Sequence, residues 1–428
     1  MKRIEPRTLP GFMELLPKDQ IKFNRILDII KNNYEKYGFL PIDTPVIESS
    51  EVLLAKAGGE TEKQIYRFNK GDTDLSLRFD LTVPLAKYVA KNYNDLAFPF
   101  RRYQIGKVYR GERTQRGRFR EFYQCDIDII DNENLNIIND AEIPSIIYNI
   151  FKEIDFGKFT IRINNRKVLS GFFEELGLSD KVTDVLRIVD KIDKIGKDEV
   201  FEILKEMEID SEKVSKIIDF ITTKENIIEY LNSLKIENEL FKAGVSELEI
   251  VQRYMADFGV PEDYFKIDLS IARGLDYYTG TVYETIIDEH PEIGSICSGG
   301  RYENLAEYYT DKKLPGVGIS IGLSRLFFVL NEYNLLKENS SNSIAEYLIV
   351  PMVEDLSYPI SVATKLRVSG KKVELYFDEK SMKKKMNYAN KLGVPNVIII
   401  GEDEVAQGKV MVKNMETGEQ VLKFVDEL

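Results

Sequence analysis

Five arginines and two glycines are concentrated in one short stretch of the chain. The glycines are Gly111 and Gly117, and the arginines are Arg110, Arg113, Arg116, Arg118 and Arg120. A guanidinium group presents a rigid fork of N–H donors that matches phosphate oxygens, so this cluster suits a polyphosphate. Phe122 is followed at alternate positions by Gln124, Asp126 and Asp128, which on an extended strand places a ring, an amide and two carboxylates beside the arginines. A solvated basic loop is the alternative for the arginines taken alone.

Three further segments carry groups that could bind a substrate. Asp80 and Thr82 place a carboxylate and a hydroxyl at alternate positions. The string Arg273-Gly274-Leu275-Asp276-Tyr277-Tyr278-Thr279-Gly280 combines a guanidinium with two phenols, and residues 316–325 run from a glycine-rich stretch to Arg325. Such glycines let a nucleotide approach the backbone. The alternatives are a turn with core tyrosines for the string and a core strand beside a surface arginine for residues 316–325.

The arginine-rich stretch requires an antiparallel strand on each side. Residues 103–109 and 122–130 alternate in the way that predicts these strands. Helical spacing over residues 20–37 ends at Gly38, a plausible helix stop. Between these parts, the pattern predicts an extended segment with prolines at 39–47, a hairpin of strands 64–68 and 75–79, and a helix at 82–93.

The pattern in the second half of the chain predicts a helical segment, then further strands and a C-terminal module. Residues 161–259 are rich in Lys, Glu, Asp and Ile at helical spacing, and either a solvated spacer or an RNA-contacting insertion fits them. Strands are predicted at 268–271 and 281–287, and residues 316–326 pass from strand to helix. After a polar linker, a βαβαβ pattern with a mainly parallel sheet and a final hairpin is predicted from strands 347–351, 372–377, 396–400, 410–413 and 420–424 and helices 356–368 and 381–392.

Composition indicates a soluble globular protein of two or three domains. The chain has 428 residues, 43% of them apolar, and 59 Lys and Arg against 71 Asp and Glu give a formal net charge of −12. This balance argues against non-specific coating of nucleic acid, although local basic patches still allow an RNA partner. Two cysteines are too few for a disulfide framework and fit a reducing cytoplasm. No apolar run reaches the roughly 18 residues of a membrane span, and the lone His290 belongs to no metal-ligand cluster.

These segments together resemble a known family. Residues 110–124 resemble motif 2 of class II aminoacyl-tRNA synthetases, and the string from Arg273 to Gly280 resembles the signature of histidyl-tRNA synthetases. Residues 20–47 and 299–325 resemble motifs 1 and 3. The resemblance implies an α/β fold with an α+β catalytic core: a class II antiparallel sheet flanked by helices. The implied domains are residues 1–160 and 260–330 for the two parts of the catalytic core, 161–259 for a helical insertion, 331–344 for a linker and 345–428 for an α/β anticodon-binding domain.

The resemblance also implies an ATP site. In the family, the residue matching Arg110 holds the α-phosphate and the amino-acid carboxylate, and the one matching Arg273 contacts the α-phosphate from the opposite side. Phe122 matches the ring that stacks on adenine. Arg118 and Arg325 match further ATP-binding arginines, Arg325 on the γ-phosphate or adenine side.

The matching histidine site draws on the same segments. The implied ligands of the substrate ammonium and carboxylate are Asp80, Thr82, Arg110, Arg273 and Gln124, and those of the side chain are Asp128, Tyr277 and Tyr278. In the family, the position of Asp128 faces the imidazole and the second tyrosine hydrogen-bonds the ring. A carboxylate there rejects analogues that lack the imidazole N–H, because they leave its charge unpaired.

The implied reaction is histidine–tRNA ligation through a histidyl-adenylate. ATP would be a substrate with Mg²⁺, no tightly bound cofactor is expected, and the expected partners are tRNA(His), L-histidine and a second copy of the chain, with neither DNA nor membrane. A basic patch of Lys383, Lys384 and Lys385 would dock RNA in the C-terminal module. The main alternative is the catalytically silent, synthetase-like regulatory subunit of ATP phosphoribosyltransferase, and a further one is a synthetase-like RNA sensor. Arg110, Arg273, Arg325 and the C-terminal module favour the ligase.

Overall fold

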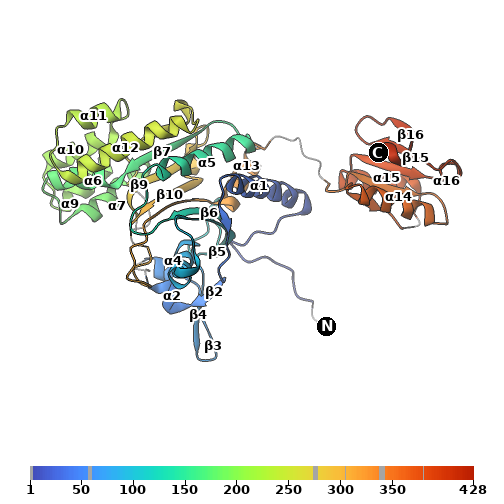
Figure 1. Cartoon of the computed structure of the whole chain (residues 1–428), viewed down its shortest axis with the longest axis horizontal. Coiled ribbons are helices and arrows are strands. Elements are labelled where there is room, and N and C mark those ends of the chain that lie inside the picture. The colour runs from blue at the N-terminus through green and yellow to red at the C-terminus, as the bar shows by residue number, and fades with distance from the viewer. Residues whose placement is uncertain (1–2, 56–59, 273–277, 304, 337–342, 379) are drawn as a thin grey trace. The chain divides into compact units, whose positions relative to one another are not determined.

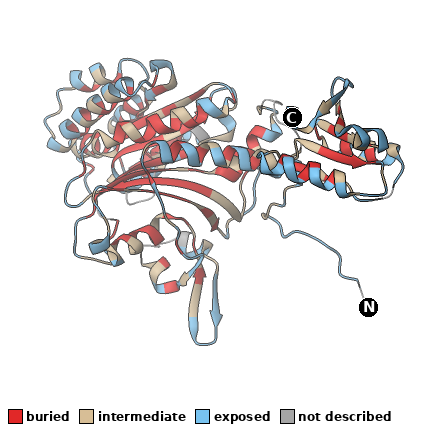
Figure 2. Ribbon diagram, turned by 45° about the vertical axis from the view of Figure 1, so that its right-hand side comes forward, coloured by how far each residue is buried: buried red, intermediate tan, exposed pale blue. Residues whose placement is uncertain are grey.

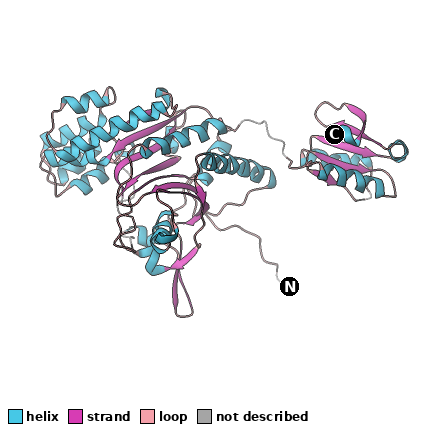
Figure 3. Ribbon diagram, viewed as in Figure 1, coloured by secondary structure: helices cyan, strands magenta, loops and turns pink. Residues whose placement is uncertain are grey.

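A computed structural model describes residues 3–55, 60–272, 278–303, 305–336, 343–378 and 380–428. The chain forms two compact units, Met1–Glu14 with Ile26–Leu336 and Leu15–Arg25 with Lys337–Leu428. Each unit has its own sheet, as the strands of Figure 3 show. No helix in the described part of the chain is both long enough and apolar enough to span a membrane.

The larger unit is built on an antiparallel sheet with a parallel strand at each edge. Among the described residues, this sheet has eight strands in the order β1-β5-β6-β11-β10-β9-β7-β8. Strands β5, β6, β7, β9 and β10 are labelled in Figure 1. The edge strands β1 and β8 run parallel to β5 and β7, and all the other pairs are antiparallel. The strands are β1 (Leu40–Pro41), β5 (Phe100–Tyr109), β6 (Glu121–Ile130), β7 (Phe159–Asn165), β8 (Phe265–Ile267), β9 (Tyr278–Ile287), β10 (Cys297–Tyr302) and β11 (Gly316–Ile321).

Side-chain alternation along β6 separates the two faces of this sheet. Cys125, Ile127 and Ile129 share one face and are fully buried. Helices α5 (Asn139–Ile154) and α12 (Glu239–Asp257) pack near it. In helix α1 (Pro17–Lys36), the Tyr34 hydroxyl donates to the Cys125 carbonyl at 2.9 Å. Figure 2 shows the buried strands beneath helices. The other face receives Gln124 and its alternating neighbours, and it carries the candidate site.

A small sheet and a short helix lie at the end of this second face. Strands β2 (Ile47–Ser49), β3 (Arg67–Lys70) and β4 (Thr73–Leu77) form a sheet in the order β2-β4-β3. The neighbouring helices are α2 (Ser50–Leu54), α3 (Glu60–Gln64) and α4 (Thr82–Lys91). Leu85 and Val89 of α4 pack with Phe100 and Tyr302 of the large sheet, so α4 is held firmly against the strands. Its first turn is thereby fixed near the site.

Most of the segment between β7 and β8 is helical. Its helices are α6 (Arg166–Glu175), α7 (Val182–Val189), α8 (Ile192–Ile195), α9 (Lys197–Glu206), α10 (Ser211–Thr222), α11 (Ile227–Ser233) and α12. Helices α6 and α12 cross closely because both present glycine at the contact. A Cβ at Gly171 would lie 2.5 Å from the Phe241 nitrogen, and one at Gly244 would lie 2.7 Å from the Val168 nitrogen.

The second unit contains a five-stranded mixed sheet in its described part, in the order β13-β12-β14-β15-β16. Its strands are β12 (Tyr347–Pro351), β13 (Val373–Leu375), β14 (Asn396–Ile400), β15 (Lys409–Asn414) and β16 (Gln420–Phe424), and its helices are α14 (Ser357–Val368), α15 (Met382–Leu392) and α16 (Glu402–Gln407). Strands β13, β12 and β14 are parallel, and β15 and β16 add an antiparallel hairpin. This arrangement confirms the predicted βαβαβ module.

The structure confirms the predicted fold class and corrects several details. The predicted strand at 268–271 is wrong, because the Asp268 carboxylate accepts hydrogen bonds from the Ser270 amide and hydroxyl and forms a turn there. Helix α16 was not expected. Lys385 does not belong to the basic patch, because it is buried and its Nζ donates to the Pro351 carbonyl at 2.6 Å. Residues 161–165 of the predicted insertion pair in β7, and the domain boundaries stay predictions.

Candidate active site

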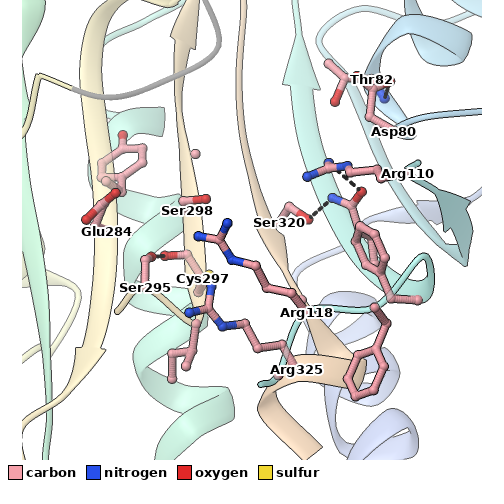
Figure 4. A pocket seen from close by; sticks show the side chains of 18 of the residues that line it. Asp80, Thr82, Arg110, Arg118, Glu284, Ser295, Cys297, Ser298, Ser320 and Arg325 are labelled. Carbon is pink, nitrogen blue, oxygen red and sulfur yellow. Dashed lines mark hydrogen bonds between the residues drawn. The ribbon is translucent and has the colours of Figure 1, made fainter. Parts of the chain in front are cut away.

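A pocket of about 470 Å³ opens on the second face of the large sheet (Figure 4). It is lined from four separated parts of the chain: the start of α4, the β5–β6 connection with β6, strands β9 and β10, and the passage from β11 to α13 (Leu323–Glu332). The sequence-predicted residues that line it are Asp80, Thr82, Arg110, Arg118, Phe122, Gln124, Tyr278 and Arg325. The fold therefore gathers most of the predicted site into one cavity.

Arg110 lies at the exit of β5, between two aromatic rings. Its guanidinium carbon is 4.4 Å from the ring centre of Phe79 and 5.0 Å from that of Phe122. Its Nε donates to the Phe79 carbonyl at 3.2 Å, and its Nη2 donates to Gln124 Oε1 at 3.5 Å. These contacts hold a permanent positive charge in the pocket wall, where it can meet a phosphate or a carboxylate.

Asp80 is oriented by the beginning of α4. Its Oδ1 accepts hydrogen bonds from the backbone amides of Thr82 and Val83, at 3.2 and 3.0 Å. Burial raises the pKa of Asp80, and the Val83 amide and the charge of Arg110 oppose that shift. A buried carboxylate next to a threonine at a pocket wall can pair with an ammonium group.

Two arginines reach the pocket from other elements. Arg118 belongs to the β5–β6 connection, where its Nη1 lies 3.8 Å from Glu112 Oε2. Arg325 stands in the first turn of α13 and donates to the Ile293 carbonyl. Figure 4 shows both side chains extending into the pocket. Together with Arg110 they bring three guanidinium groups to one cavity, which suits an anion with several charges.

Tyr278 opens strand β9 and also lines the pocket. Gly300 on the neighbouring strand leaves room for it, since a Cβ there would lie 2.9 Å from the Tyr278 ring. Arg273 and Tyr277, the other predicted residues of this signature, lie outside the described residues. Their roles stay predictions.

Asp128 is not among the residues that line the pocket. Its Oδ2 lies 2.5 Å from Nη2 of the fully buried Arg102, and the Tyr302 hydroxyl donates to its Oδ1 at 3.0 Å. Gly318 accommodates this carboxylate, because a Cβ there would lie 2.1 Å from Asp128 Oδ1. Burial raises the pKa of Asp128 to about 6, against the opposing effects of Arg102 and Tyr302. The predicted contact of Asp128 with a substrate imidazole therefore stays a prediction.

The structure adds pocket residues that the sequence did not single out. Ser320 of β11 accepts a hydrogen bond from Gln124 Nε2 at 2.7 Å (Figure 4). Glu112, Glu284 and Ser298 also line the cavity. Ser320 could have been found from its place in the glycine-rich stretch 316–322, but only the pairing of β11 with β6 shows that it meets Gln124.

Comparisons with known proteins agree with this geometry. A family model described as Histidyl-tRNA synthetase matches residues 11–326, and one described as Anticodon binding domain matches residues 346–428. The chain is 61% identical to the histidine–tRNA ligase of Clostridium tetani over 427 residues, covering 99% of this chain and 97% of that protein. It is 51% identical to the histidine–tRNA ligase of Finegoldia magna over 428 residues, covering 99% of each protein.

A solved structure is similar over the same extent. The crystal structure of histidyl-tRNA synthetase from Nostoc sp. PCC 7120 matches with a TM-score of 0.91 at 42% identity, covering 99% of this chain and 98% of that one. The similarity thus extends over both units of the chain.

Proposed function

This chain belongs to the histidyl-tRNA synthetase family and is a histidine–tRNA ligase, and we propose that the pocket described above is where it joins histidine to ATP. The regulatory-subunit alternative is not favoured, since the full-length relatives are histidine–tRNA ligases. The observation that carries the proposal is the convergence of Asp80, Arg110, Gln124 and Arg325 on one cavity.

The first step is attack of the histidine carboxylate on the α-phosphorus of ATP. A bond forms between a carboxylate oxygen and phosphorus, the bond to the bridging oxygen breaks, and pyrophosphate leaves with the electron pair. Arg110, at the junction of the predicted histidine and ATP positions, offsets the charge that develops on the α-phosphate. Phe122 stacks on adenine, and Arg118 and Arg325 take the remaining phosphates and the nucleotide. Positioning and electrostatics perform this step without a general base.

Histidine binds at the other end of the pocket. Its ammonium group pairs with the Asp80 carboxylate and the Thr82 hydroxyl, both fixed at the start of α4. Gln124 holds the amino-acid backbone, and Tyr278 hydrogen-bonds the imidazole ring. Asp128 is the predicted acceptor for the imidazole N–H, and its pairing with Arg102 and Tyr302 behind the pocket wall would orient its carboxylate.

Mg²⁺ arrives with ATP. The described residues include no cluster of three or more His, Cys, Asp or Glu side chains able to hold a metal by themselves. Glu112 and Glu284 line the pocket, and their carboxylates would supply hard oxygen ligands to Mg²⁺ in addition to the phosphate oxygens. The metal ion neutralises charge on the phosphates when it is bound.

The second step transfers histidine to the terminal ribose of tRNA. A cavity of about 710 Å³ shares Arg118, Glu284 and Arg325 with the pocket and reaches Asp190 and Ile192 beside α8. It is large enough for a terminal nucleotide, so we assign the tRNA 3′ end to it. This assignment favours the RNA-contacting role for the helical insertion. In the C-terminal module, exposed Lys383 and Lys384 of α15 supply positive charge for the tRNA(His) backbone.

The active form is a homodimer in the cytoplasm. Leu40 and Ile47 are 59% and 48% exposed on the segment that resembles motif 1, and β1 is an edge strand of the large sheet. Exposed apolar side chains beside a strand edge that is unpaired in the described part of the chain favour a protein partner. Cys125 and Cys297 are free and buried, which fits a reducing compartment.

Histidine-dependent exchange of labelled pyrophosphate into ATP tests the proposal, with the other amino acids as controls. We expect exchange with histidine alone in the wild type. Arg110→Ala should lower the exchange rate by at least about a hundredfold while the fold is kept, because a positioned positive charge contributes several kcal/mol to the transition state. Arg187→Ala, at an exposed arginine of α7, is the matched control. Normal exchange in Arg110→Ala would reject this site.

A further inference from the structure

The two ends of the Gln124 amide have different partners. Nε2 donates to Ser320 Oγ at 2.7 Å, and Oε1 accepts from Arg110 Nη2 at 3.5 Å (Figure 4). A guanidinium group has only donors, so the atom that faces Arg110 must be the carbonyl oxygen. Gln124 is only 9% exposed, so its orientation is set by these protein groups. A half-turn of the amide would direct its NH₂ group at the guanidinium and would be unfavourable.

The orientation of the Ser320 hydroxyl decides which end of the Gln124 amide can form a hydrogen bond with it. A serine hydroxyl has one proton to donate and lone pairs to accept with. Ser320 is the direct cross-strand partner of Asp126, and its side chain is hydrogen-bonded to the Asp126 carboxylate. When Asp126 is ionised its carboxylate can only accept, and the Ser320 proton is then directed toward Asp126. Ser320 Oγ then presents a lone pair, and only the NH₂ end of Gln124 fits it.

From this chain of contacts we infer that Ser320 and Asp126 are positioning residues for the reaction. They hold Gln124 with its carbonyl oxygen toward Arg110 and toward the amino-acid end of the pocket. The inference rests on the proposed function, in which Gln124 holds the backbone of histidine. Neither Ser320 nor Asp126 needs to contact the substrate, because Asp126 acts through Ser320 and Ser320 acts through Gln124.

The surroundings of Asp126 support a role beyond packing. The side chain is 3% exposed, and its Oδ1 has no hydrogen-bond partner among the described residues. Burial raises the pKa of Asp126 to about 7, while Arg102 of β5 lowers it and Asp128 and Asp80 raise it further. A carboxylate is costly to bury in such a place, and an apolar residue would stabilise the fold more. The role of Asp126 in orienting Gln124 gives a functional reason for this loss of stability.

The test compares Ser320→Ala, Ser320→Thr and Asp126→Asn in pyrophosphate exchange, with KM measured separately for histidine and ATP. Ser320→Ala should raise KM for histidine about tenfold and leave KM for ATP within about twofold, as expected for one lost oriented hydrogen bond. Ser320→Thr keeps the hydroxyl and should restore most of the loss. Asp126→Asn should raise KM for histidine by less than Ser320→Ala does, because an asparagine carbonyl can still accept the Ser320 proton, whereas its NH₂ end can instead donate to Ser320 Oγ and release that proton toward Gln124 Oε1.

Ser324→Ala is the matched control. Ser324 is a buried serine that accepts a hydrogen bond from the Tyr123 backbone amide of β6 at 2.9 Å, so its loss perturbs the same strand without reaching the Gln124 amide. This variant should be less stable with an unchanged KM for histidine. An unchanged KM for histidine in Ser320→Ala, equal rises for both substrates, or a threonine variant as impaired as the alanine variant would overturn the inference. Absence of histidine-dependent exchange in the wild type would instead reject the proposed function.

Discussion

Strand β6 carries two buried aspartates, Asp126 and Asp128. Asp126 and Asp128 point to the same face of the strand, and the fully buried Arg102 of β5 lies directly opposite Asp128 and lowers the pKa of both carboxyls. Burial raises the pKa of Asp126 to about 7 and that of Asp128 to about 6. Both groups therefore change charge close to neutral pH, and both connect pH to the stability of the fold.

The sign of that connection can be tested with Asp126→Asn. The pKa of Asp126 is higher in the folded protein than the roughly 3.9 of a free aspartate, so the folded state binds the proton more tightly. Its contribution to stability is full below pH 4 and is lost as pH rises toward 7. Urea unfolding between pH 4 and 8 should show the wild type losing stability with rising pH, and Asp126→Asn losing less.

The pKa of Asp128 is also raised in the folded protein, so part of the pH dependence of stability should remain in Asp126→Asn. Asp72→Asn, at an exposed turn between β3 and β4, controls for the removal of one carboxylate and should behave as the wild type does. Superimposable profiles of wild type and Asp126→Asn would contradict the predicted shift.

Side chains of helix α13 anchor the connection between β5 and β6. Arg116 Nε lies 2.9 Å from both carboxylate oxygens of Glu332, and its guanidinium carbon is 5.5 Å from the ring centre of Tyr333. Phe119 meets Phe328 edge to face, with ring centres 5.7 Å apart. The loop that carries Arg118 into the pocket is thus held at two points by the helix that carries Arg325.

Releasing the loop should weaken ATP binding. Glu332→Arg replaces attraction by repulsion at Arg116, and we expect a severalfold rise in KM for ATP in pyrophosphate exchange, with a smaller change for histidine. Adding Arg116→Glu in the same chain should recover part of the loss, because the pair is then restored with its charges exchanged.

Asp184→Arg, in the exposed Arg187–Asp184 pair of α7, is the control for a charge reversal away from the pocket. A double variant no better than Glu332→Arg would show that the ion pair does not position the loop.

For the whole molecule, the proposed homodimer depends on a few exposed apolar side chains. Leu40, Val46 and Ile47 are all more than a third exposed in the single chain and lie within one short segment. Leu40 belongs to β1, whose outer edge is unpaired within the described part of the chain. Burial of such residues between two copies removes apolar surface from water and satisfies the edge.

A charge in that segment should separate the two copies. Ile47→Asp places a carboxylate on a surface that the proposed dimer desolvates, so light scattering should report the mass of one chain where the wild type shows twice that mass. Phe258→Asp, at a 38% exposed phenylalanine after α12, is the matched control and should leave the mass unchanged. A dimeric Ile47→Asp would place the interface elsewhere.

The sequence by itself determined much of the chemistry and local structure. The arginine cluster, the Asp80 and Thr82 pair and the glycine-rich stretch before Arg325 indicate an anion and amino-acid site, and all three contribute to one pocket. Alternation predicted the strands on either side of the arginines, because a strand with different environments on its two faces must repeat every second residue. Motif order along the chain was sufficient to indicate the family.

Only the tertiary structure decided which side chains meet. Ser320 reaches Gln124 and Asp126 because β11 pairs with β6, although the two strands are almost two hundred residues apart in sequence. Lys385 reads as one of three equivalent lysines, yet it is buried on the inner side of α15 while its neighbours are exposed. Asp128 of β6 likewise pairs with Arg102 of the neighbouring strand β5. Sequence patterns report local periodicity, whereas strand register and helix rotation set these contacts through packing between distant segments.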